Sequence, residues 1–467
     1  MDPSAPFFNR ERELAQLDAA WAAPGAQLVT LWGRRRVGKS TLLSRFANGK
    51  RGIYFYGTRM TERSVLDALA IQVAEAFDDA YLRTAPFPTW DSALGYLSDR
   101  ARDERTLVVV DEFPYLCETT PGLDTLVQRW WDRVHASTQL VLVLAGSGFS
   151  FMEGLTGARG PLHGRRTSQV EVHPFDYLDA ARFFDNLAPA DRVRAYASFG
   201  GVPAYLRHWN PSLDLQANLE TTMLTPSHVL FREAEELLRT EFHQVALYAS
   251  ILRAVANGEE RPSDIARAVG RHSADEIFDH LYRLQELRFL QREVPVTDQG
   301  RPRGQRVLYR LADPYLRFWF RFVAPFQSLL QLGRGRDLWQ REIEPNLDAF
   351  VGRTTWESVC QQCLWRRIAD GHLPVEVAQL GRWWDGKDEI DVVGLWNGRA
   401  TLIGECKWSR SPVGQDVLLS LQQKSARLPT GPRPLWVLAS QSGFTPELRR
   451  RAAAADDLLL LDPAALY

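Results

Sequence analysis

The segment 33–40, which reads GRRRVGKS, constrains the fold of this chain more than any other feature. It comes after an apolar run at residues 27–30, which predicts a buried strand, and it opens into a helical pattern from Thr41 onward. Glycines at both ends let the backbone N–H groups turn inward, and the following helix adds the positive end of its dipole. Strand, glycine-bounded loop, Lys-Ser pair and helix together predict a P-loop for nucleotide phosphates.

The side chains of this loop predict ATP and magnesium as its ligands. Lys39 brings positive charge to the outer phosphates, and the Ser40 hydroxyl is suited to ligate magnesium. We expect the nucleotide to be bound by Gly33, Arg36, Gly38, Lys39, Ser40 and Thr41.

Two carboxylates follow the next strong apolar run. Residues 107–110 are four consecutive aliphatic residues, typical of a strand buried in a parallel sheet, and Asp111 and Glu112 come directly after them. We expect Asp111 to hold magnesium through water and Glu112 to orient or deprotonate the attacking water. A further apolar run ends just before Ser147, which we expect to sense the outermost phosphate; the alternative is a plain strand-ending turn.

Arginines supply two more predictions in this part of the chain. Arg159, Arg165 and Arg166 lie in a glycine-rich segment, where one of them is either an arginine finger at the γ-phosphate or part of a solvated basic loop. Arg10 precedes the first helical pattern, in a segment that is either an arm beside the adenine or simply a helix start.

Alternation of strand and helix patterns predicts a parallel three-layer sheet with its site at the carboxyl ends of the strands. Helical patterns then take over, and the turn around Pro203 is expected to close over the nucleotide base as part of a lid. From about residue 242, three helical patterns and a hairpin-like pair predict a winged helix-turn-helix. Its basic residues indicate contact with DNA, or a solvated basic face on a protein-interaction module: Arg271, His272, Arg283, Arg288, Arg301, Arg303 and Arg306.

A second chemical constellation lies near the carboxyl terminus. Asp391 lies in one predicted strand, Glu405 and Lys407 in the next, and Glu357 in a preceding helix. A simple two-residue turn would place Asp391 and Glu405 on opposite faces, so a metal site requires a longer loop or a β-bulge. Glu357, Asp391 and Glu405 would then ligate magnesium while Lys407 positions water; the alternative is a surface hairpin with an ordinary ion pair.

Length and composition set outer bounds. With 467 residues the chain predicts about three or four domains, and four cysteines give no disulfide framework, which favours a reducing compartment. Neither a signal pattern nor an apolar run of membrane-spanning length is present, so we expect a cytoplasmic location and no membrane partner.

The chain resembles archaeal and bacterial P-loop ATPases related to the STAND and AAA+ proteins that carry a C-terminal restriction-endonuclease-like, PD-(D/E)xK, domain. The resemblance rests on residues 9–14, 33–40, 111–114, 146–147, 161–165, 200–203, 313–319 and the pair of segments 389–391 and 405–408. It implies an α/β multidomain protein: a P-loop core (1–175), a helical lid and connector (176–235), a winged helix (236–325) and the nuclease-like domain (326–467). It also implies that Arg165 is the finger and that Glu112, Lys39 and Lys407 are catalytic. One departure is Ile390, where the nuclease motif often has proline.

These observations predict an ATP-hydrolysing, DNA-associated protein whose nucleotide state is coupled to a winged helix and a magnesium-dependent deoxyribonuclease domain. One alternative is a STAND-type switch in which ATP gates homo-oligomer assembly and the terminal domain does not cleave. Another is a DNA-binding regulator in which the winged helix carries the specificity.

Overall fold

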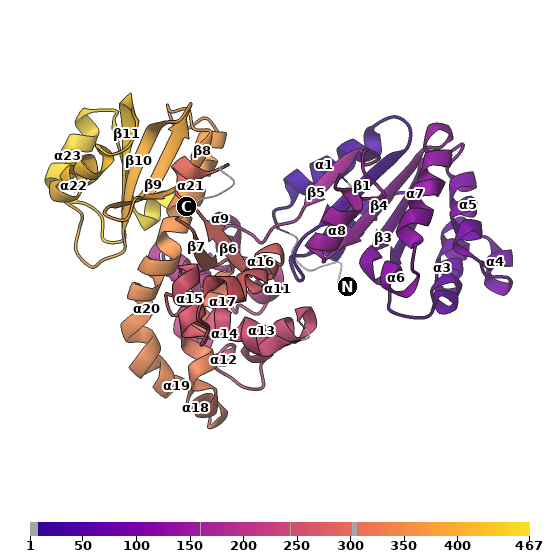
Figure 1. Cartoon of the computed structure of the whole chain (residues 1–467), viewed down its shortest axis with the longest axis horizontal. Coiled ribbons are helices and arrows are strands. Elements are labelled where there is room, and N and C mark those ends of the chain that lie inside the picture. The colour runs from indigo at the N-terminus through magenta and orange to yellow at the C-terminus, as the bar shows by residue number, and fades with distance from the viewer. Residues whose placement is uncertain (1–7, 159, 243, 301–305) are drawn as a thin grey trace. The chain divides into compact units, whose positions relative to one another are not determined.

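The computed structural model describes residues 8–158, 160–242, 244–300 and 306–467, and divides into two compact units, residues 1–174 and 175–467 (Figure 1). Within these ranges, no helix is long and apolar enough to cross a membrane. Arg159, Arg301 and Arg303, three of the predicted basic contacts, lie outside the described residues.

The first unit is built on a five-stranded parallel sheet. Its strands run in the order β2-β3-β4-β1-β5, so β4 lies between the P-loop strand β1 and the acidic strand β3. Because all the strands are parallel, their carboxyl ends meet at one edge. The strands are β1 (Gln27–Trp32), β2 (Gly52–Tyr56), β3 (Thr106–Asp111), β4 (Leu140–Gly146) and β5 (Ser168–Glu171).

Side-chain alternation along the strands builds the predicted three layers. In β1, Leu28 and Trp32 pack in one apolar cluster, whereas Val29 and Leu31 pack in another. The first cluster includes residues of α3 (Glu62–Phe77), α5 (Trp90–Arg100), α6 (Phe113–Thr119), α7 (Leu123–Val134) and α8 (Phe149–Thr156). The second includes residues of α1 (Glu11–Ala22) and α2 (Lys39–Ala47), and α4 (Ala80–Thr84) lies beside α3.

The second unit begins with helices. They are α9 (Tyr177–Ala180), α10 (Pro189–Phe199), α11 (Pro203–Leu206), α12 (Leu215–Thr221), α13 (Val229–Glu241), α14 (Val245–Ala256), α15 (Pro262–Ala268) and α16 (Phe278–Glu286). An antiparallel pair follows, β6 (Leu290–Glu293) with β7 (Leu308–Leu311). A further helical segment contains α17 (Pro314–Phe318), α18 (Gln327–Gln331), α19 (Gly335–Leu338), α20 (Glu344–Val351) and α21 (Glu357–Ala369).

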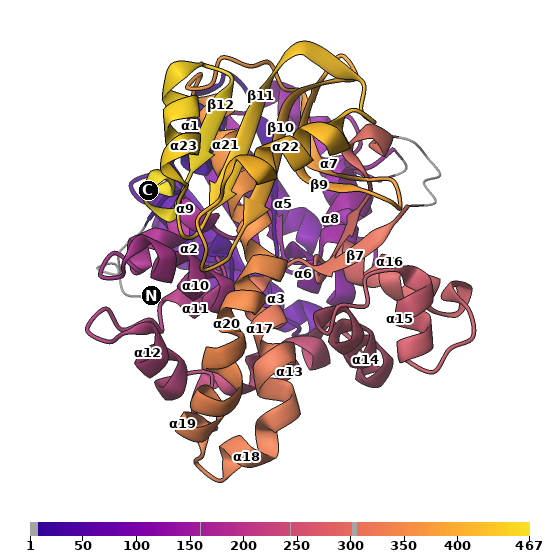
Figure 2. The same cartoon turned by 90° about the vertical axis from the view of Figure 1, so that its left-hand side faces the viewer.

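A mixed sheet forms the carboxyl-terminal part of the second unit (Figure 2). Its order is β12-β11-β10-β9-β8. The β8–β9 and β9–β10 pairs are antiparallel, and the β10–β11 and β11–β12 pairs are parallel. Residues of α21 pack in a cluster with Val392 and Val437, whereas those of α22 and α23 pack in another with Val393 and Leu438. The elements are β8 (Gln379–Trp384), β9 (Glu389–Trp396), β10 (Arg399–Lys407), α22 (Gln415–Ser425), β11 (Thr430–Ser440), α23 (Pro446–Ala454) and β12 (Leu458–Leu461).

The hairpin between β9 and β10 contains the bulge that the acidic-site interpretation requires. Asn397 and Gly398 form a two-residue turn with φ of 49° and 74°, as a type I′ hairpin needs. The register then shifts at Thr401, from Ala400 opposite Leu395 to Leu402 opposite Gly394. Continuing this shifted register places Asp391 opposite Glu405, so the geometric prediction is confirmed.

Candidate functional site

The P-loop has the backbone geometry that its sequence predicts. Gly38 has a φ of 93°, a left-handed conformation in which a side chain would be strained, and α2 begins at the next residue. A Cβ on Gly33 would lie 2.2 Å from the Val172 carbonyl oxygen, so only glycine fits there. Lys39 Nζ donates to the carbonyl oxygens of Gly33 (2.9 Å) and Arg34 (3.3 Å), which holds the ammonium against the loop.

Asp111 is the most enclosed polar group at the carboxyl edge of this sheet. Its side chain is 0% exposed, and its Oδ2 accepts hydrogen bonds from the Ser40 hydroxyl (2.6 Å) and the Tyr54 hydroxyl (2.6 Å). Its Oδ1 accepts from the backbone N–H of Glu112 at 3.0 Å. A hydroxyl and a carboxylate in direct contact are oxygen ligands of the kind that magnesium prefers at a P-loop, so Ser40 and Asp111 fit that ion.

Tyr54 contacts the candidate site through Asp111, and the sequence did not predict this contact. Burial, followed by the charge of Asp111, raises the pKa of Tyr54 far above its ordinary value, so its hydroxyl stays protonated and donates. The signal available was a tyrosine in the middle of a short apolar strand, next to a strand that ends in acids. Without the strand order, that signal does not identify the partner of the hydroxyl.

Glu112 and Ser147 meet because β4 is the neighbour of β3. The Ser147 hydroxyl lies 3.1 and 3.0 Å from the two carboxylate oxygens of Glu112. Glu112 itself has a left-handed φ of 53° and caps α6. The strand order therefore places Ser147 between the P-loop strand and the acids, and its contact with the outermost phosphate remains a prediction.

Arg10 is hydrogen-bonded to the backbone of the P-loop. Its Nη2 donates to the carbonyl oxygens of Val37 (2.9 Å) and His173 (2.8 Å), and its Nη1 pairs with Glu13 at 2.7 Å. The side chain is 6% exposed. This arrangement fixes the loop's backbone, and it gives Arg10 a structural role in addition to the predicted one beside the adenine.

Two other loop residues occupy the predicted segment, and one predicted contact lies in the other unit. Arg36 has a left-handed φ of 70°, and Thr41 lies in the first turn of α2. Pro203 begins α11 in the second unit, so its contact with the nucleotide base remains a prediction.

Arg165 lies away from the P-loop within its own unit. It precedes β5, and Thr167 donates its backbone N–H to Leu28 near the start of β1, so this segment lies at the amino-terminal edge of the strands. The P-loop lies at the opposite edge of the sheet. It begins about five residues after Leu28 along β1, which corresponds to roughly 16 Å at the rise of a β-strand. The Arg165 guanidinium forms a bidentate pair with Asp132 on α7, at 2.6 and 2.8 Å. A role as a finger would therefore have to be exerted on another copy of the chain.

The arginines of the second unit that we predict to face DNA lie around the helices α14, α15 and α16 and the β6–β7 pair. Arg283 pairs with Glu286 at 3.2 Å, Arg271 with Glu276 at 3.9 Å and Arg306 with Asp298 at 2.7 Å. The Arg271–Glu276 pair is exposed and contributes about 0–1 kcal/mol, whereas the carboxylate of Asp298 that pairs with Arg306 is buried.

Asp391 is buried, and the charges of two other carboxylates act on it. It is 8% exposed, and its Oδ2 accepts from the backbone N–H of Cys406 at 2.8 Å. Burial, together with the charges of Glu357 and Glu405, raises the pKa of Asp391 to about 7. An acidic group held half-protonated near neutral pH is a place where a cation would be stabilising.

Glu405 is held by two lysines but keeps one oxygen unsatisfied. Its Oε1 accepts from Lys407 Nζ (2.7 Å) and from Lys424 Nζ on α22 (3.1 Å). Its Oε2 is buried and has no hydrogen-bond partner among the described residues. Burial acts to lower the pKa of Lys407, but the bond and charge of Glu405 outweigh it, and the pKa is raised. Asp391 and the unsatisfied oxygen of Glu405 suit a hard cation.

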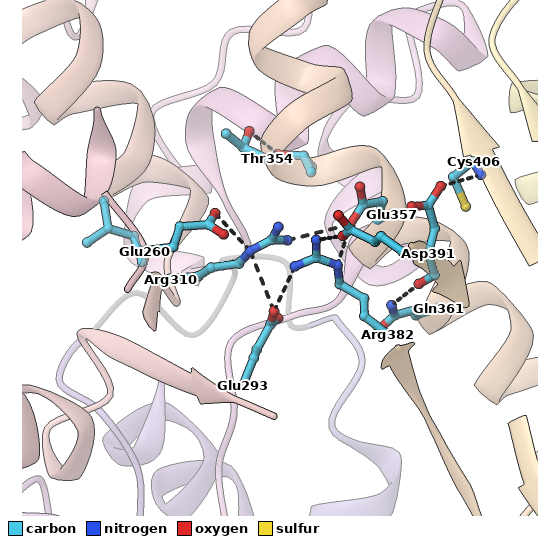
Figure 3. A network of polar contacts seen from close by, with 12 residues as sticks. Glu260, Glu293, Arg310, Thr354, Glu357, Gln361, Arg382, Asp391 and Cys406 are labelled. Carbon is cyan, nitrogen blue, oxygen red and sulfur yellow. Dashed lines mark hydrogen bonds and ion pairs between the residues drawn. The ribbon is translucent and has the colours of Figure 1, made fainter. Parts of the chain in front are cut away.

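Glu357 is engaged elsewhere. Its carboxylate pairs with Arg382 at 3.1 Å and Arg310 at 3.5 Å, and both arginines also contact Glu293 (Figure 3). In the part of the chain that the structure describes, no three His, Cys, Asp or Glu side chains are arranged to hold a metal ion. The predicted three-carboxylate set is therefore not assembled, because two arginines hold the third member.

Two family models match separate parts of the chain, and the first extends beyond the first unit. Residues 7–208 match a family model described as an ATPase domain predominantly from Archaea, and residues 319–426 match one described as archaeal and bacterial proteins of unknown function. An uncharacterized protein of Methanocaldococcus jannaschii, MJECL04, is 26% identical to this chain over 404 residues. The match covers 86% of this chain and 87% of the length of MJECL04. An uncharacterized ATP-binding protein of the same organism, MJ0423, is 44% identical over 45 residues, or 10% of this chain and 76% of its own.

A solved structure shares the fold. The Walker-type ATPase PABY2304 of Pyrococcus abyssi superposes with a TM-score of 0.50 at 22% identity, over 68% of this chain and 96% of that one. The parallel sheet, the P-loop geometry and the family match therefore lead to one conclusion. The amino-terminal part of the chain matches an archaeal ATPase-domain model and has the parallel sheet of P-loop ATPases, and residues 319–426 of the second unit match a family of archaeal and bacterial proteins of unknown function.

Proposed function

We propose that this chain binds ATP at the P-loop and hydrolyses it with the acids of β3. The observation that carries the proposal is the direct contact of the Ser40 hydroxyl with the fully buried Asp111, at the carboxyl edge of the parallel sheet. Backbone N–H groups of the loop and Lys39 bind the phosphates, and Ser40 and Asp111 hold the magnesium ion. When bound, magnesium neutralises charge that develops on the phosphate oxygens.

Glu112 and Ser147 carry the hydrolytic step in this proposal. Glu112 exchanges its bond with Ser147 for the attacking water, which it orients and from which it accepts a proton. Ser147 is then released toward the outermost phosphate. The pair thus links the position of the base to the presence of that phosphate.

Phosphate release by the purified full-length chain tests this assignment. Lys39→Ala is expected to abolish turnover, and Glu112→Gln to lower it by about 10²–10⁴-fold with ATP binding retained. Lys387→Ala, which alters an exposed lysine in the second unit, is the matched control and should turn over ATP like the unmodified chain. Full turnover by the Lys39→Ala chain would remove the basis of the proposal.

We further propose that the second unit associates with DNA through the three helices and the β6–β7 pair acting as a winged helix. The mixed-sheet domain then supplies a magnesium-dependent nuclease site. The supporting observation is the bulge at Thr401, which brings Asp391 and Glu405 opposite one another with Lys407 beside them. Asp391 and Glu405 would hold the cation, and Lys407 would position the water.

Cleavage of plasmid DNA tests the nuclease assignment. Magnesium-dependent nicking should be lost in Asp391→Asn and Lys407→Ala and kept in Lys387→Ala. Nicking that survives both changes assigns cleavage to other residues.

The engagement of Glu357 by Arg310 and Arg382 favours one alternative, a non-cleaving domain in an ATP-gated switch or DNA-binding regulator. Nucleotide-dependent oligomers or sequence-selective footprints, without nicking by the unmodified chain, would support it.

A further inference from the structure

A small pocket in the second unit is lined by three arginines that come from separate segments. Arg310 comes from β7, Arg317 from α17 and Arg353 from the helical turn between α20 and α21. The pocket wall also includes Gly258, Glu260 and Thr354. The pocket is partly open to solvent, and its empty space of about 360 Å³ includes that open part. Figure 3 shows Glu260, Arg310 and Thr354 of this wall.

Arg310 is the neutralised member of the three. Its guanidinium pairs with Glu260 at 3.1 Å, with Glu293 at 3.5 Å and with Glu357 at 3.5 Å. Of the residues that line the pocket, Glu260 is the one acid, and Arg310 already uses it.

Arg317 and Arg353 leave positive charge without a matching carboxylate. The Arg317 guanidinium donates from Nε to the carbonyl oxygen of Leu311 (2.5 Å) and from Nη1 to that of Thr354, and neither acceptor carries a net charge. Neither arginine forms an ion pair with any described residue. Burial, and then the charge of Arg310, lower the pKa of Arg317 to about 10, although Glu293 and Asp313 offset part of this effect. Burial makes the charge of Arg317 costly, and a bound anion relieves that cost, whereas the Arg353 side chain is exposed to solvent.

The backbone leaves room for the Arg353 side chain. Gly258 has a left-handed φ of 104°, and a Cβ built on it would lie 3.2 Å from Arg353 Nη1. Glycine therefore permits both the turn and the close approach of the guanidinium.

We propose that this pocket binds a phosphate-type oxyanion through the guanidinium groups of Arg317 and Arg353. Planar guanidinium groups match the spacing of phosphate oxygens and bind them in a bidentate manner. The shared chemistry is that of a phosphate group, supplied either by free phosphate or by a phosphodiester of a nucleic acid. The site is distinct from the P-loop, since its residues belong to the other unit.

Titration calorimetry with inorganic phosphate tests the site, in the full-length chain carrying Lys39→Ala so that the P-loop does not contribute. The Lys39→Ala chain should bind phosphate, and adding Arg353→Gln should weaken binding by about 10–100-fold, since a charge-assisted hydrogen bond contributes about 1.5–3 kcal/mol. Arg336→Gln, which alters an exposed arginine of α19, is the matched control and should bind like its parent. Arg317→Lys, which keeps the charge but loses the fork, should also bind more weakly.

A competing oligonucleotide identifies the source of the phosphate. If a short DNA duplex displaces phosphate from the Lys39→Ala chain and this displacement is lost with Arg353→Gln, the pocket binds a phosphodiester. If the duplex leaves phosphate binding unchanged, the pocket binds the free anion. The proposal is overturned if the Lys39→Ala chain takes up neither phosphate nor duplex, or if Arg353→Gln binds both as its parent does.

Discussion

Two hydroxyl groups donate hydrogen bonds to the same carboxylate oxygen of Asp111 in the candidate site of the first unit. Ser40 comes from the P-loop helix and Tyr54 from β2, so the carboxylate is fixed from two elements. A buried acid with short bonds of this kind keeps its position when a ligand binds. Tyr54 is therefore a positioning residue in the proposed hydrolysis.

Tyr54→Phe should lower ATP turnover by about 5–30-fold, because one hydrogen bond to a buried charged group is lost at a cost of about 1–2 kcal/mol. ATP binding should change little, and the magnesium concentration for half-maximal turnover should rise. Tyr81→Phe, which alters a tyrosine that is 72% exposed, is the matched control. Unchanged turnover and magnesium dependence in Tyr54→Phe would limit the hydroxyl to a packing role.

The raised pKa of Asp391 makes the stability of the second unit depend on pH. Below the ordinary pKa of 3.8 the group is protonated in both the folded and the unfolded chain and costs nothing. As pH rises toward the folded value of about 7, the unfolded chain ionises first, so the free energy of unfolding falls across this window.

Asp391→Asn should therefore raise the thermal midpoint at pH 8 by a few degrees and leave it nearly unchanged at pH 4, since each pKa unit corresponds to about 1.4 kcal/mol. Thermal unfolding at both pH values, without divalent cations, checks this. If Asp391→Asn lowers the thermal midpoint equally at pH 4 and pH 8, ionisation of Asp391 does not destabilise the folded chain.

Among the elements, the β9–β10 hairpin shows how one extra residue sets a site. The type I′ turn alone would pair Asp391 with Gly404, and the extra residue Thr401 shifts the pairing by one. Thr401 is fixed by a hydrogen bond from its hydroxyl to the Glu376 carbonyl oxygen, at 2.7 Å.

Deleting Thr401 should lower the midpoint of denaturant unfolding by much more than Thr401→Ala, because deletion drives the acids and the apolar residues of one strand to the wrong faces. The alanine variant loses only the hydroxyl bond, at about 1 kcal/mol. Equal midpoints for the two variants would mean that the bulge does not fix the register.

The elements also show what sequence can and cannot predict. The P-loop, the acidic strand and the bulge requirement follow from local spacing, because a turn or a strand tip depends on few neighbours. The bond from Tyr54 to Asp111 depends on strand order, and the position of Arg165 depends on the edge at which β5 begins. The engagement of Glu357 by Arg310 and Arg382 joins residues from three elements, which no local pattern encodes.

For the molecule as a whole, the edge on which Arg165 lies determines how the proposed arginine finger could act. If this arginine serves as a finger, it acts on a second copy of the chain, after exchanging Asp132 for a phosphate.

Mixing two inactive chains tests this arrangement. Arg165→Ala and Lys39→Ala should each show low turnover alone, and an equimolar mixture should recover part of it, since an intact P-loop then meets an intact arginine. Phosphate release as a function of total protein concentration is the measurement. Full activity of Arg165→Ala alone would exclude a finger role for this residue.

Nucleotide binding by the first unit is the claim on which the rest depends. Isothermal titration calorimetry of ATP and ADP, in magnesium, with the full-length chain and its Lys39→Ala variant measures it directly. We predict saturable uptake of one nucleotide per chain, lost or strongly weakened in the variant. Heat changes absent from the folded, unmodified chain, or equal in the two chains, would contradict it.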